Sequence, residues 1–523
     1  MKRGQIFEGT IVDSDFPNKS KVLFYEEKED VKTSFFSVVK GGIEGQKIRF
    51  RIKRSRQDSC TGVLLETLEK SPMETVENTC PKFGLCGGCT YQSVPYEKQL
   101  ELKKKWIRKI FKDVITPEKN GGKGFDDIYE DIHKSPKVYE YRNKMEFSFG
   151  DEVKDGPMTL GLHKKHSFYD VIDAAGCNIV NENYSVIINL VKAYVIAKNI
   201  PMYNKKIHEG TVRHLLVRYS ETYDEILVAI VTSSQGNYDF TPLADLIVKA
   251  ENGVDYEGEN YKLNCKVRGV LNIVNDTLSD AVKCDKLINL YGDDYLMEKL
   301  LGKEFKLSVF SFFQTNTLGA EVLYSQVQNY VLEAEEIDGE KEDKEDKIDK
   351  SDKGDKVIFD LFCGTGTIAQ ILAPVARKVI GVELIEDAVE AAKVNANLNG
   401  LDNCEFIAGD VFKVLDEIEE KPDIIVLDPP REGVMPKALE KVLAYGVKNI
   451  VYVSCKPTSL ARDLDVFFEN GYEVKRMCNV DLFPMTVHVE TVVCLSNKKS
   501  KDYVEIGVDA EDYYRIKDSE KSE

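Results

Sequence analysis

A cysteine stands directly after an apolar strand near the C-terminal end of the chain. The segment NIVYVSCKP, residues 449–457, places Cys455 where that strand is expected to end. A thiol reacts as the thiolate, and the adjacent Lys456 is expected to help lower the pKa of Cys455. A strand-end cysteine taken alone is more often an ordinary buried residue. Its chemistry therefore depends on what the fold brings beside it.

A candidate proton acceptor follows in the segment TVHVE. Thr486, His488 and Glu490 alternate along it, and a strand would place all three side chains on one face. Glu490 is the candidate general base. We expect His488 to position a substrate or to donate a hydrogen bond.

A cofactor loop is predicted at DLFCGTGTIA, residues 360–369, which reads as a strand, a glycine-rich turn and the start of a helix. Gly364 and Gly366 allow the backbone to approach a ligand at the helix N-terminus. Glu383, at the end of the next strand, stands where a carboxylate accepts hydrogen bonds from ribose hydroxyls. The same glycines, with Ala369, satisfy the dinucleotide fingerprint, so the motif alone leaves both NAD and S-adenosylmethionine open.

The segment Asp428-Pro-Pro-Arg431 favours the methyl donor. It follows the strand DIIVLD, beside the crevice of a doubly wound sheet. It looks like the substrate loop of S-adenosylmethionine methyltransferases that act on nucleobases or amides, and dehydrogenases have no use for it. Methylation of a pyrimidine at C5 requires a thiolate that adds to C6 and a base that removes the C5 proton. Cys455 and Glu490 are candidates for these two roles.

Three cysteines crowd the segment CPKFGLCGGC, residues 80–89. Cys80, Cys86 and Cys89 follow a C-x5-C-x2-C spacing, and the two glycines between the last pair allow tight curvature. Structural zinc prefers two closely spaced pairs. An iron–sulfur cluster with three local ligands and one remote ligand fits the spacing better. The nearest following cysteine is Cys177.

The rest of the chain excludes several classes of protein. Its 523 residues carry a net charge of −18, and much of the acidic excess lies in a low-complexity segment at 333–356 and a charged tail at 498–523. No apolar run is long enough to span a membrane, and the N-terminus has no secretory signal. Twelve cysteines without such a signal indicate a reducing compartment. We therefore expect a cytoplasmic protein with no membrane association.

The pattern of apolar and polar residues predicts an α/β chain with three folded parts. Short Gly-bounded strands in residues 1–70 indicate a small β-barrel. Residues 71–300 mix strands and helices and form a central domain. A basic amphipathic helix at 96–116 is a candidate to pack with the catalytic domain, although the central domain lies between the two in the sequence. Strands and helices alternate over 301–497, which predicts a Rossmann-like parallel sheet covered by helices.

The motifs SCKPTSLARD, DLFCGTGTI, DPPREG, FFQTN and HVETVV together resemble those of the bacterial RNA uracil-C5 methyltransferases, the RumA/TrmA family, and the likeness covers roughly residues 1–497. The resemblance implies a class I S-adenosylmethionine-dependent RNA (uracil-5-)-methyltransferase. Its barrel would be a TRAM domain, an OB-like RNA-binding module, and its α+β central domain would hold a [4Fe–4S] cluster.

The resemblance also implies roles for individual residues. Cys455 would be the nucleophile and Glu490 the general base. The cofactor S-adenosylmethionine would be bound by Gln314, Phe362, Thr367, Glu383, Asp410 and Asp428. The cluster would be held by Cys80, Cys86, Cys89 and Cys177. Arg142 and Lys144, in YRNKMEFSF, are similar to the family's RNA-facing strand. Some relatives carry Asn at Thr367, and several carry Asn at Lys456.

The cluster cysteines and the barrel are typical of the family branch that modifies 23S ribosomal RNA, so rRNA processing is the favoured function and a monomer the expected state. The alternative substrate is the T-loop of tRNA. A non-catalytic RNA-binding or redox-sensing protein on the same fold is a further alternative, but it would have lost Cys455 or Glu490. A dehydrogenase is the most distant one.

Overall fold

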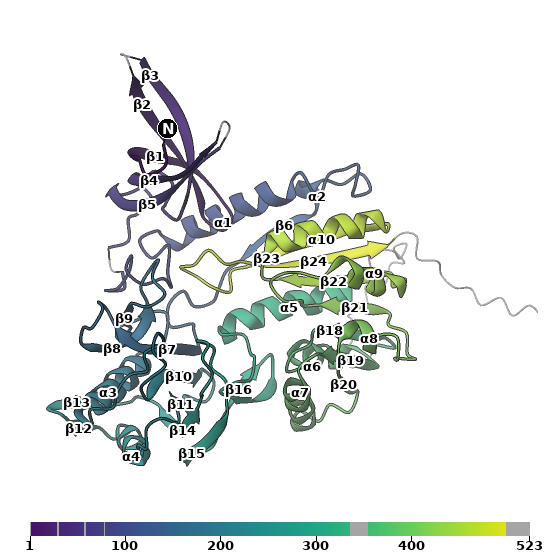
Figure 1. The fold of residues 1–523 in the computed structure, drawn as a ribbon. Coiled ribbons are helices and arrows are strands. Elements are labelled where there is room, and N and C mark those ends of the chain that lie inside the picture. Colours follow the sequence, from purple (N-terminus) through teal and green to yellow (C-terminus); the bar gives the residue numbers. More distant parts are fainter. Residues whose placement is uncertain (1, 29–30, 57–58, 78, 335–353, 498–523) are drawn as a thin grey trace, which may run out of the picture.

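The computed structural model describes residues 2–28, 31–56, 59–77, 79–334 and 354–497. Most of the acidic insertion expected at 333–356, and all of the tail expected at 498–523, lie outside these residues. Within the described ranges, no helix is both long and apolar enough to cross a membrane. Figure 1 shows a barrel at the upper left, a second sheet below it, and a larger sheet with helices at the right.

The N-terminal strands close a barrel in the order β1-β2-β3-β5-β4. Alternate residues of these strands, such as Val22, Phe24 and Phe50, point inward and form the barrel's own core. The five-stranded barrel expected near the N-terminus is thereby confirmed. Its strands are Ile6–Asp15 (β1), Lys19–Lys28 (β2), Val31–Lys40 (β3), Lys47–Arg56 (β4) and Ser59–Glu69 (β5).

A basic helix, α1 (Tyr96–Phe111), connects the barrel to the large sheet. Its apolar side, including the fully buried Trp106, belongs to the same core as the large sheet. Lys105 and Lys109 both form ion pairs with Asp13 of β1, at N–O distances of 2.7 and 2.5 Å. The positive charges of this helix thus serve contacts within the chain.

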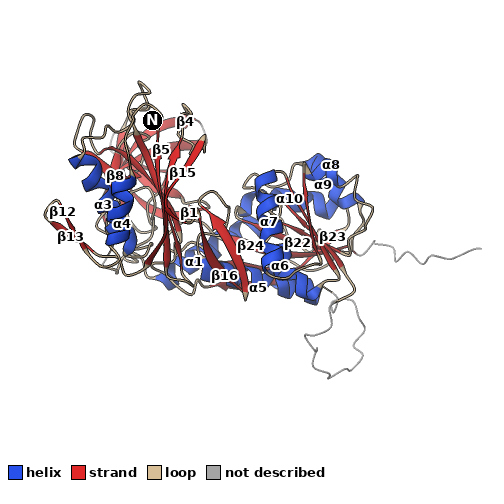
Figure 2. Cartoon of the chain, turned by 90° about the horizontal axis from the view of Figure 1, so that it is seen from below, coloured by secondary structure: helices blue, strands red, loops and turns tan. Residues whose placement is uncertain are grey.

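The central region is built on a seven-stranded sheet with the order β15-β14-β11-β10-β7-β8-β9. Figure 2 shows the helices α3 (Asn183–Ala197) and α4 (Thr241–Lys249) packed together against it. Pairing within the sheet is mostly antiparallel, and the β11–β14 pair is parallel. The strands are Lys144–Asp151 (β7), Met158–His163 (β8), Val171–Asp173 (β9), Val212–Ser220 (β10), Glu225–Thr232 (β11), Lys266–Val274 (β14) and Lys286–Gly292 (β15).

A hairpin and a long helix lead from the central sheet into the large one. The hairpin consists of β16 (Tyr295–Leu300) and β17 (Lys303–Ser308). After it, α5 (Thr317–Glu333) begins at Asn316, whose side-chain oxygen accepts a hydrogen bond from the Gly319 N–H. This N-cap fixes the point at which α5 starts.

The large sheet has eight strands in the order β20-β19-β18-β21-β22-β24-β23-β6. Its first five strands are parallel, as alternation of strands and helices predicts. β24 follows them and runs antiparallel to both of its neighbours, β22 and β23, and β6 pairs in parallel with β23 at the edge. The strands are Tyr129–His133 (β6), Val357–Leu361 (β18), Lys378–Glu383 (β19), Cys404–Ala408 (β20), Ile424–Leu427 (β21), Asn449–Ser454 (β22), Tyr472–Val480 (β23) and Glu490–Asn497 (β24).

Candidate active site

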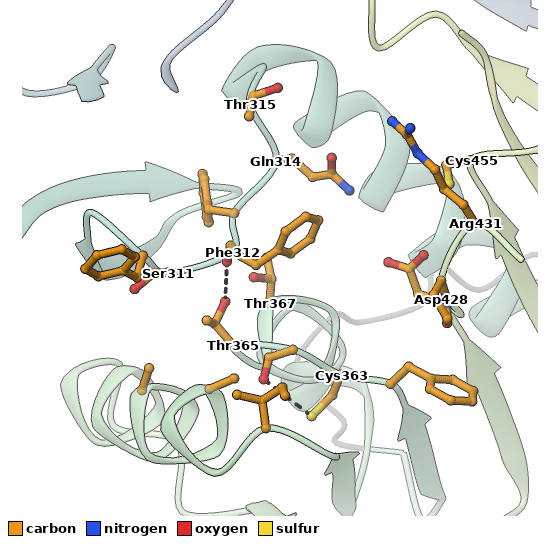
Figure 3. A pocket seen from close by; sticks show the side chains of 18 of the residues that line it. Ser311, Phe312, Gln314, Thr315, Cys363, Thr365, Thr367, Asp428, Arg431 and Cys455 are labelled. Carbon is orange, nitrogen blue, oxygen red and sulfur yellow. Dashed lines mark hydrogen bonds between the residues drawn. The ribbon is translucent and has the colours of Figure 1, made fainter. Parts of the chain in front are cut away.

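A cleft of ≈ 1780 Å³ opens where the parallel strands of the large sheet end. Figure 3 shows the side chains of Gln314, Asp428 and Arg431 in this cleft, with Cys455 beside Arg431. The eight residues to which the family resemblance gave a catalytic or donor-binding role all line it: Gln314, Phe362, Thr367, Glu383, Asp410, Asp428, Cys455 and Glu490.

The glycine-rich turn forms one end of the cleft. Phe362 adopts a left-handed backbone conformation with φ 68°, which is strained for a bulky residue and recurs at functional sites. Gly366 also has a positive φ, and a Cβ there would lie 2.5 Å from the Phe406 ring. A side chain at residue 366 would therefore clash with Phe406 of β20 and push the turn away from that strand. Directly after it, α6 (Thr367–Leu372) begins.

Glu383 closes this end of the cleft. Its two carboxylate oxygens accept hydrogen bonds from the backbone N–H groups of Gly364 (3.1 Å) and Ile385 (3.0 Å). These bonds hold the carboxylate at the end of β19, where a ribose is expected in a doubly wound fold.

Two carboxyl groups, those of Asp428 and Glu490, line the cleft, and a third, that of Asp360, is buried beneath the glycine-rich turn. Burial raises the pKa of Asp428 to about 7. Burial, and next the charge of Asp428, raise the pKa of Asp360 to about 8. Burial, the largest cause, and Asp428 likewise raise the pKa of Glu490 to about 8. A cation placed among these groups would be stabilised by them and would favour their ionised forms.

The charged groups that most affect the Cys455 thiol do not include its neighbour Lys456. Burial, the largest cause, and the charges of Glu490 and Asp428 raise the pKa of Cys455 to about 11, while the charge of Arg431 acts to lower it. Lys456 instead lies 3.6 Å from the carboxylate of Glu432. The predicted effect of Lys456 is not among the largest influences on the pKa of Cys455 and stays a prediction.

Glu490 begins β24, but the residues before it do not continue the strand. Met485 has φ 66°, and the Thr486 hydroxyl donates to the Phe483 carbonyl (2.8 Å), so the chain turns here. The prediction of a strand carrying Thr486, His488 and Glu490 on one face is thus wrong. All three nevertheless line the cleft. Burial lowers the pKa of His488 to about 4, so its imidazole is neutral at physiological pH.

Helix α10 (Pro457–Glu469) holds the Asp428 loop in place. The Asp463 carboxylate accepts hydrogen bonds from the Val434 N–H (2.9 Å) and the Tyr452 hydroxyl (2.7 Å). The Ser459 hydroxyl donates to the Arg431 carbonyl at 2.9 Å. Helix α10, which contains the segment SLARD, therefore holds the DPPREG loop in position.

Two asparagine side chains fix the segments that form the rest of the cleft wall. The Asn143 side chain donates to the backbone carbonyl of Gln314 at 3.0 Å, joining the central sheet to the cleft. The Asn316 side chain donates to the Leu482 carbonyl at 2.9 Å, at the start of the loop that leads to Glu490. The order of these segments along the sequence does not indicate either contact.

Sequence patterns missed two residues of the cleft. Arg431 was noted only as part of the Asp-Pro-Pro-Arg turn. Tyr324 of α5 lies fully within the protein and lines the cleft; burial raises its pKa. Its position in the middle of a helix gives no local signal of function.

The four cysteines proposed as cluster ligands line one small apolar cavity under β8 and β9: Cys80, Cys86, Cys89 and Cys177. Burial, the largest cause, and the neighbouring thiols raise the pKa of Cys89 to about 12. Among the described residues, however, no group of three or more His, Cys, Asp or Glu side chains is arranged to hold a metal ion. The thiols face a common space without forming a closed ligand set.

The cysteine segment is also bonded to the loop that leads to Glu490. The Thr90 and Tyr91 N–H groups both donate to the Met485 carbonyl, at 2.7 and 3.1 Å. The Tyr141 hydroxyl donates to the Pro484 carbonyl at 2.9 Å. The cysteine cavity and the cleft are therefore joined by the loop at 481–489.

Comparison with known proteins identifies the family. A family model described as tRNA (Uracil-5-)-methyltransferase matches residues 314–498. An uncharacterized RNA methyltransferase of Caldanaerobacter subterraneus subsp. tengcongensis is 46% identical over 492 residues, which is 94% of this chain and 99% of that protein. One of Clostridium tetani is 45% identical over 498 residues, covering 95% and 99%. The chain belongs to the RNA uracil-5-methyltransferase family.

A solved structure shows the same fold. The crystal structure of Pyrococcus abyssi tRNA (uracil-54, C5)-methyltransferase in complex with S-adenosyl-L-homocysteine has a TM-score of 0.66 and 22% sequence identity. The match covers 93% of this chain and all of that one.

This RNA uracil-5-methyltransferase is an enzyme of the S-adenosylmethionine-dependent class I type. The family assignment therefore decides between the two cofactors that the glycine-rich turn left open. The matched segment, 314–498, begins at Gln314 and includes Cys455 and Glu490. The glycine-rich turn lies within it too, whereas other lining residues of the cleft, such as Tyr141 and His163, lie outside it.

Proposed function

We propose that this enzyme methylates C5 of a uridine in 23S ribosomal RNA through a covalent bond between Cys455 and C6. The observation that supports the proposal is the convergence of Cys455, Glu490 and the glycine-rich turn on one cleft. The donor would lie against Phe362, Thr367 and Asp410, with Glu383 accepting bonds from its ribose. Gln314 and Asp428 would flank the methyl group, which S-adenosylmethionine supplies as an electrophilic carbon.

The reaction begins at the cysteine. The thiolate of Cys455 adds to C6 of uracil, and the electrons of the C5–C6 double bond move toward C5 and O4. C5 then attacks the methyl group, and the sulfonium sulfur departs with the electrons of its bond to that carbon. Glu490 accepts the C5 proton, the double bond re-forms, and the thiolate of Cys455 leaves.

The charges in the cleft suit these steps. A general base works best when its pKa lies near the operating pH, and the pKa of Glu490 is raised to about 8. Arg431 opposes the carboxylates that disfavour the Cys455 thiolate. Asp428 and Asp360 provide negative charge for a donor that carries a positive sulfonium. The neutral His488 is suited to hydrogen bonding with the base.

The choice of RNA rests on the family resemblance. The barrel and the four cysteines are typical of the branch that modifies ribosomal RNA. A T-loop uridine of tRNA is the second candidate, because the matching family model is described as a tRNA methyltransferase. We further propose that the barrel at 1–70 and the central domain at 71–300 grip the RNA, and that 301–497 carries out the chemistry in a cytoplasmic monomer.

We also propose that Cys80, Cys86, Cys89 and Cys177 hold a [4Fe–4S] cluster. Four thiols around an apolar cavity are the donor set that such a cluster requires, although they would have to draw together to bind it. Protein purified without oxygen should then contain about four iron atoms per chain, and Cys86→Ser should remove them. One tightly bound zinc and no iron would contradict this proposal.

The function can be tested by mapping 5-methyluridine in RNA. Ribosomal and transfer RNA from a strain lacking the gene should be compared with RNA from strains complemented with the wild type or with Cys455→Ala. We expect a position in 23S rRNA that is modified only with the wild type. A position in tRNA that behaves this way would favour the second candidate, and no change in either RNA would contradict both.

A further inference from the structure

The turn between β8 and β9 holds two aromatic side chains in solvent. Phe168 is 86% exposed, the largest value for a large hydrophobic residue among those described, and Tyr169 is 58% exposed. The turn is closed by hydrogen bonds: the Lys164 N–H donates to the Asp170 carbonyl (2.9 Å), and the Ser167 hydroxyl accepts from the Asp170 N–H (3.1 Å). The exposure of Phe168 therefore belongs to an ordered turn.

A second segment, residues 204–208, lies beside this turn. The Lys206 ammonium group is 4.5 Å from the centre of the Tyr169 ring, and Ile207 is 61% exposed. The two segments, HKKHSFY at 163–169 and NKKIH at 204–208, contain four lysines and no acidic residue. In a chain with a net charge of −18, this is a locally positive surface.

The barrel contributes to the same positive surface. Burial lowers the pKa of His166, and the charges of Lys165 and Lys40 lower it further. Lys40 is the last residue of β3, so the end of this barrel strand carries one of the charges that act on His166.

The turn begins at the wall of the active-site cleft. Gly87, Gly88, Leu162 and His163 all line the cleft. The Gly87 N–H donates to the His163 carbonyl at 3.3 Å, and the Lys165 N–H donates to the carbonyl of Leu85 at 2.7 Å. A polymer that leaves the cleft over His163 would therefore meet the aromatic side chains next.

We propose that Phe168 and Tyr169, with Lys206, form a platform on which an unpaired base of the substrate RNA stacks, close to the target uridine. The inference rests on the proposed function, because it takes RNA as the substrate. Any base can stack on an aromatic ring, and neighbouring lysines can bind the phosphates. Lys205 forms an ion pair with Asp280, but Lys206 lies over the Tyr169 ring. This combination of exposed aromatic rings and a neighbouring lysine fits single-stranded RNA better than it fits an apolar partner.

The platform can be tested with a short single-stranded RNA that carries the fluorescent base 2-aminopurine. Phe168→Ala should weaken its binding about tenfold, and Phe168→Leu should weaken it similarly because leucine has no ring. Phe168→Trp should preserve affinity and quench the fluorescence. The matched control is Tyr291→Ala: Tyr291 is 42% exposed and lies on β15, at the opposite edge of the same sheet from β9.

A lysine variant tests the electrostatic part. Lys206→Ala should reduce the slope of log affinity against log salt concentration by about one. S-adenosylmethionine affinity and the far-ultraviolet circular dichroism spectrum should stay unchanged in every variant, because the platform lies at the surface.

The outcomes separate the platform from the function it rests on. If the wild type methylates RNA while Phe168→Ala binds the probe as tightly as Tyr291→Ala, the proposed platform is wrong and the proposed methyltransferase function is unaffected. The same holds if Phe168→Ala changes only self-association, since the patch would then be a protein interface. If the wild type binds S-adenosylmethionine but neither binds nor methylates RNA, the proposed function and the platform both fail.

Discussion

Lys103 of α1 and Asp481 form an ion pair in which neither side chain is exposed, with the Nζ atom 2.6 Å from Oδ1. Lys103 also donates to the carbonyl of Phe483 at 3.3 Å. Beside it, the Gln99 side chain accepts a hydrogen bond from the Met485 N–H. A helix from the N-terminal part of the chain thus holds the loop that leads to Glu490.

Replacing Lys103 should therefore lower the free energy of unfolding far more than replacing its neighbour Lys104. Lys103→Met leaves the Asp481 carboxylate buried and unpaired, which typically destabilises a protein by about 3–5 kcal/mol. Lys104→Met is the control, because Lys104 pairs with Asp131 in an exposed position and such pairs contribute about 0–1 kcal/mol. Urea unfolding followed by circular dichroism measures both. Equal midpoints for the two variants would show that the buried pair does not stabilise the loop.

The pKa of Cys455 should respond to Arg431 and not to Lys456. Arg431→Met should raise it, because the stabilising positive charge is lost, and Glu490→Gln should lower it, because a negative charge is lost. Lys456→Met should leave it unchanged, since that ammonium group pairs with Glu432. The alkylation rate of the Cys455 peptide against pH, followed by mass spectrometry, reports these values. A large effect of Lys456→Met alone would support the sequence-based interpretation.

The buried carboxyl groups should make stability without ligand fall as pH rises from about 4 to 8. His488, whose pKa is lowered to about 4, contributes in the opposite direction up to about pH 6.5. The pKa values of Asp360 and Glu490 are raised to about 8 in the folded protein, whereas in an unfolded chain they lie near 4. Between these values the folded state keeps protons that the unfolded state has released, so raising the pH favours unfolding. Asp428→Asn should flatten the dependence because it removes one such carboxyl. Thermal melting temperatures across this pH range measure the dependence. Equal slopes of melting temperature against pH for the wild type and Asp428→Asn would contradict the account.

Glu383→Ala should weaken S-adenosylmethionine binding. Each lost hydrogen bond between a charged carboxylate and a ribose hydroxyl is worth about 1.5–3 kcal/mol, or about ten- to a hundredfold in affinity. Isothermal titration calorimetry measures the change. Glu390→Ala is the control, because Glu390 is exposed on α7 (Glu386–Leu398) and its carboxylate forms an ion pair with Lys393. Unchanged affinity in Glu383→Ala would remove that residue from the donor site.

Local sequence patterns predicted the parts of the site that lie at strand ends. Glycine spacing located the turn before α6, and apolar runs located the strands before Glu383, Asp428 and Cys455, because parallel strands end at one edge of a sheet. The conformation of the final loop was predicted wrongly, since TVHVE alternates like a strand although Met485 turns the chain.

Other features depend on contacts between distant segments. Lys103 meets a partner 378 residues away, and its segment reads as an ordinary basic helix. Strand β6 joins the large sheet beside β23 although the whole central sheet separates them in sequence. The spacing of residues within a short stretch of sequence cannot predict such pairings between distant segments. Arg431 was overlooked for a related reason: its effect on Cys455 exists only once two loops face each other across the cleft.

The central claim is that Cys455 makes the first bond to uracil and that Glu490 is needed only after methyl transfer. The measurement is a denaturing gel of enzyme incubated with substrate RNA and S-adenosylmethionine labelled in its methyl group. Glu490→Gln should accumulate a covalent enzyme–RNA species carrying the label, because the amide cannot accept the C5 proton and elimination stops. Cys455→Ala should form no such species and transfer no methyl group. If Cys455→Ala still methylates uridine, or if Glu490→Gln turns over like the wild type, the account is contradicted.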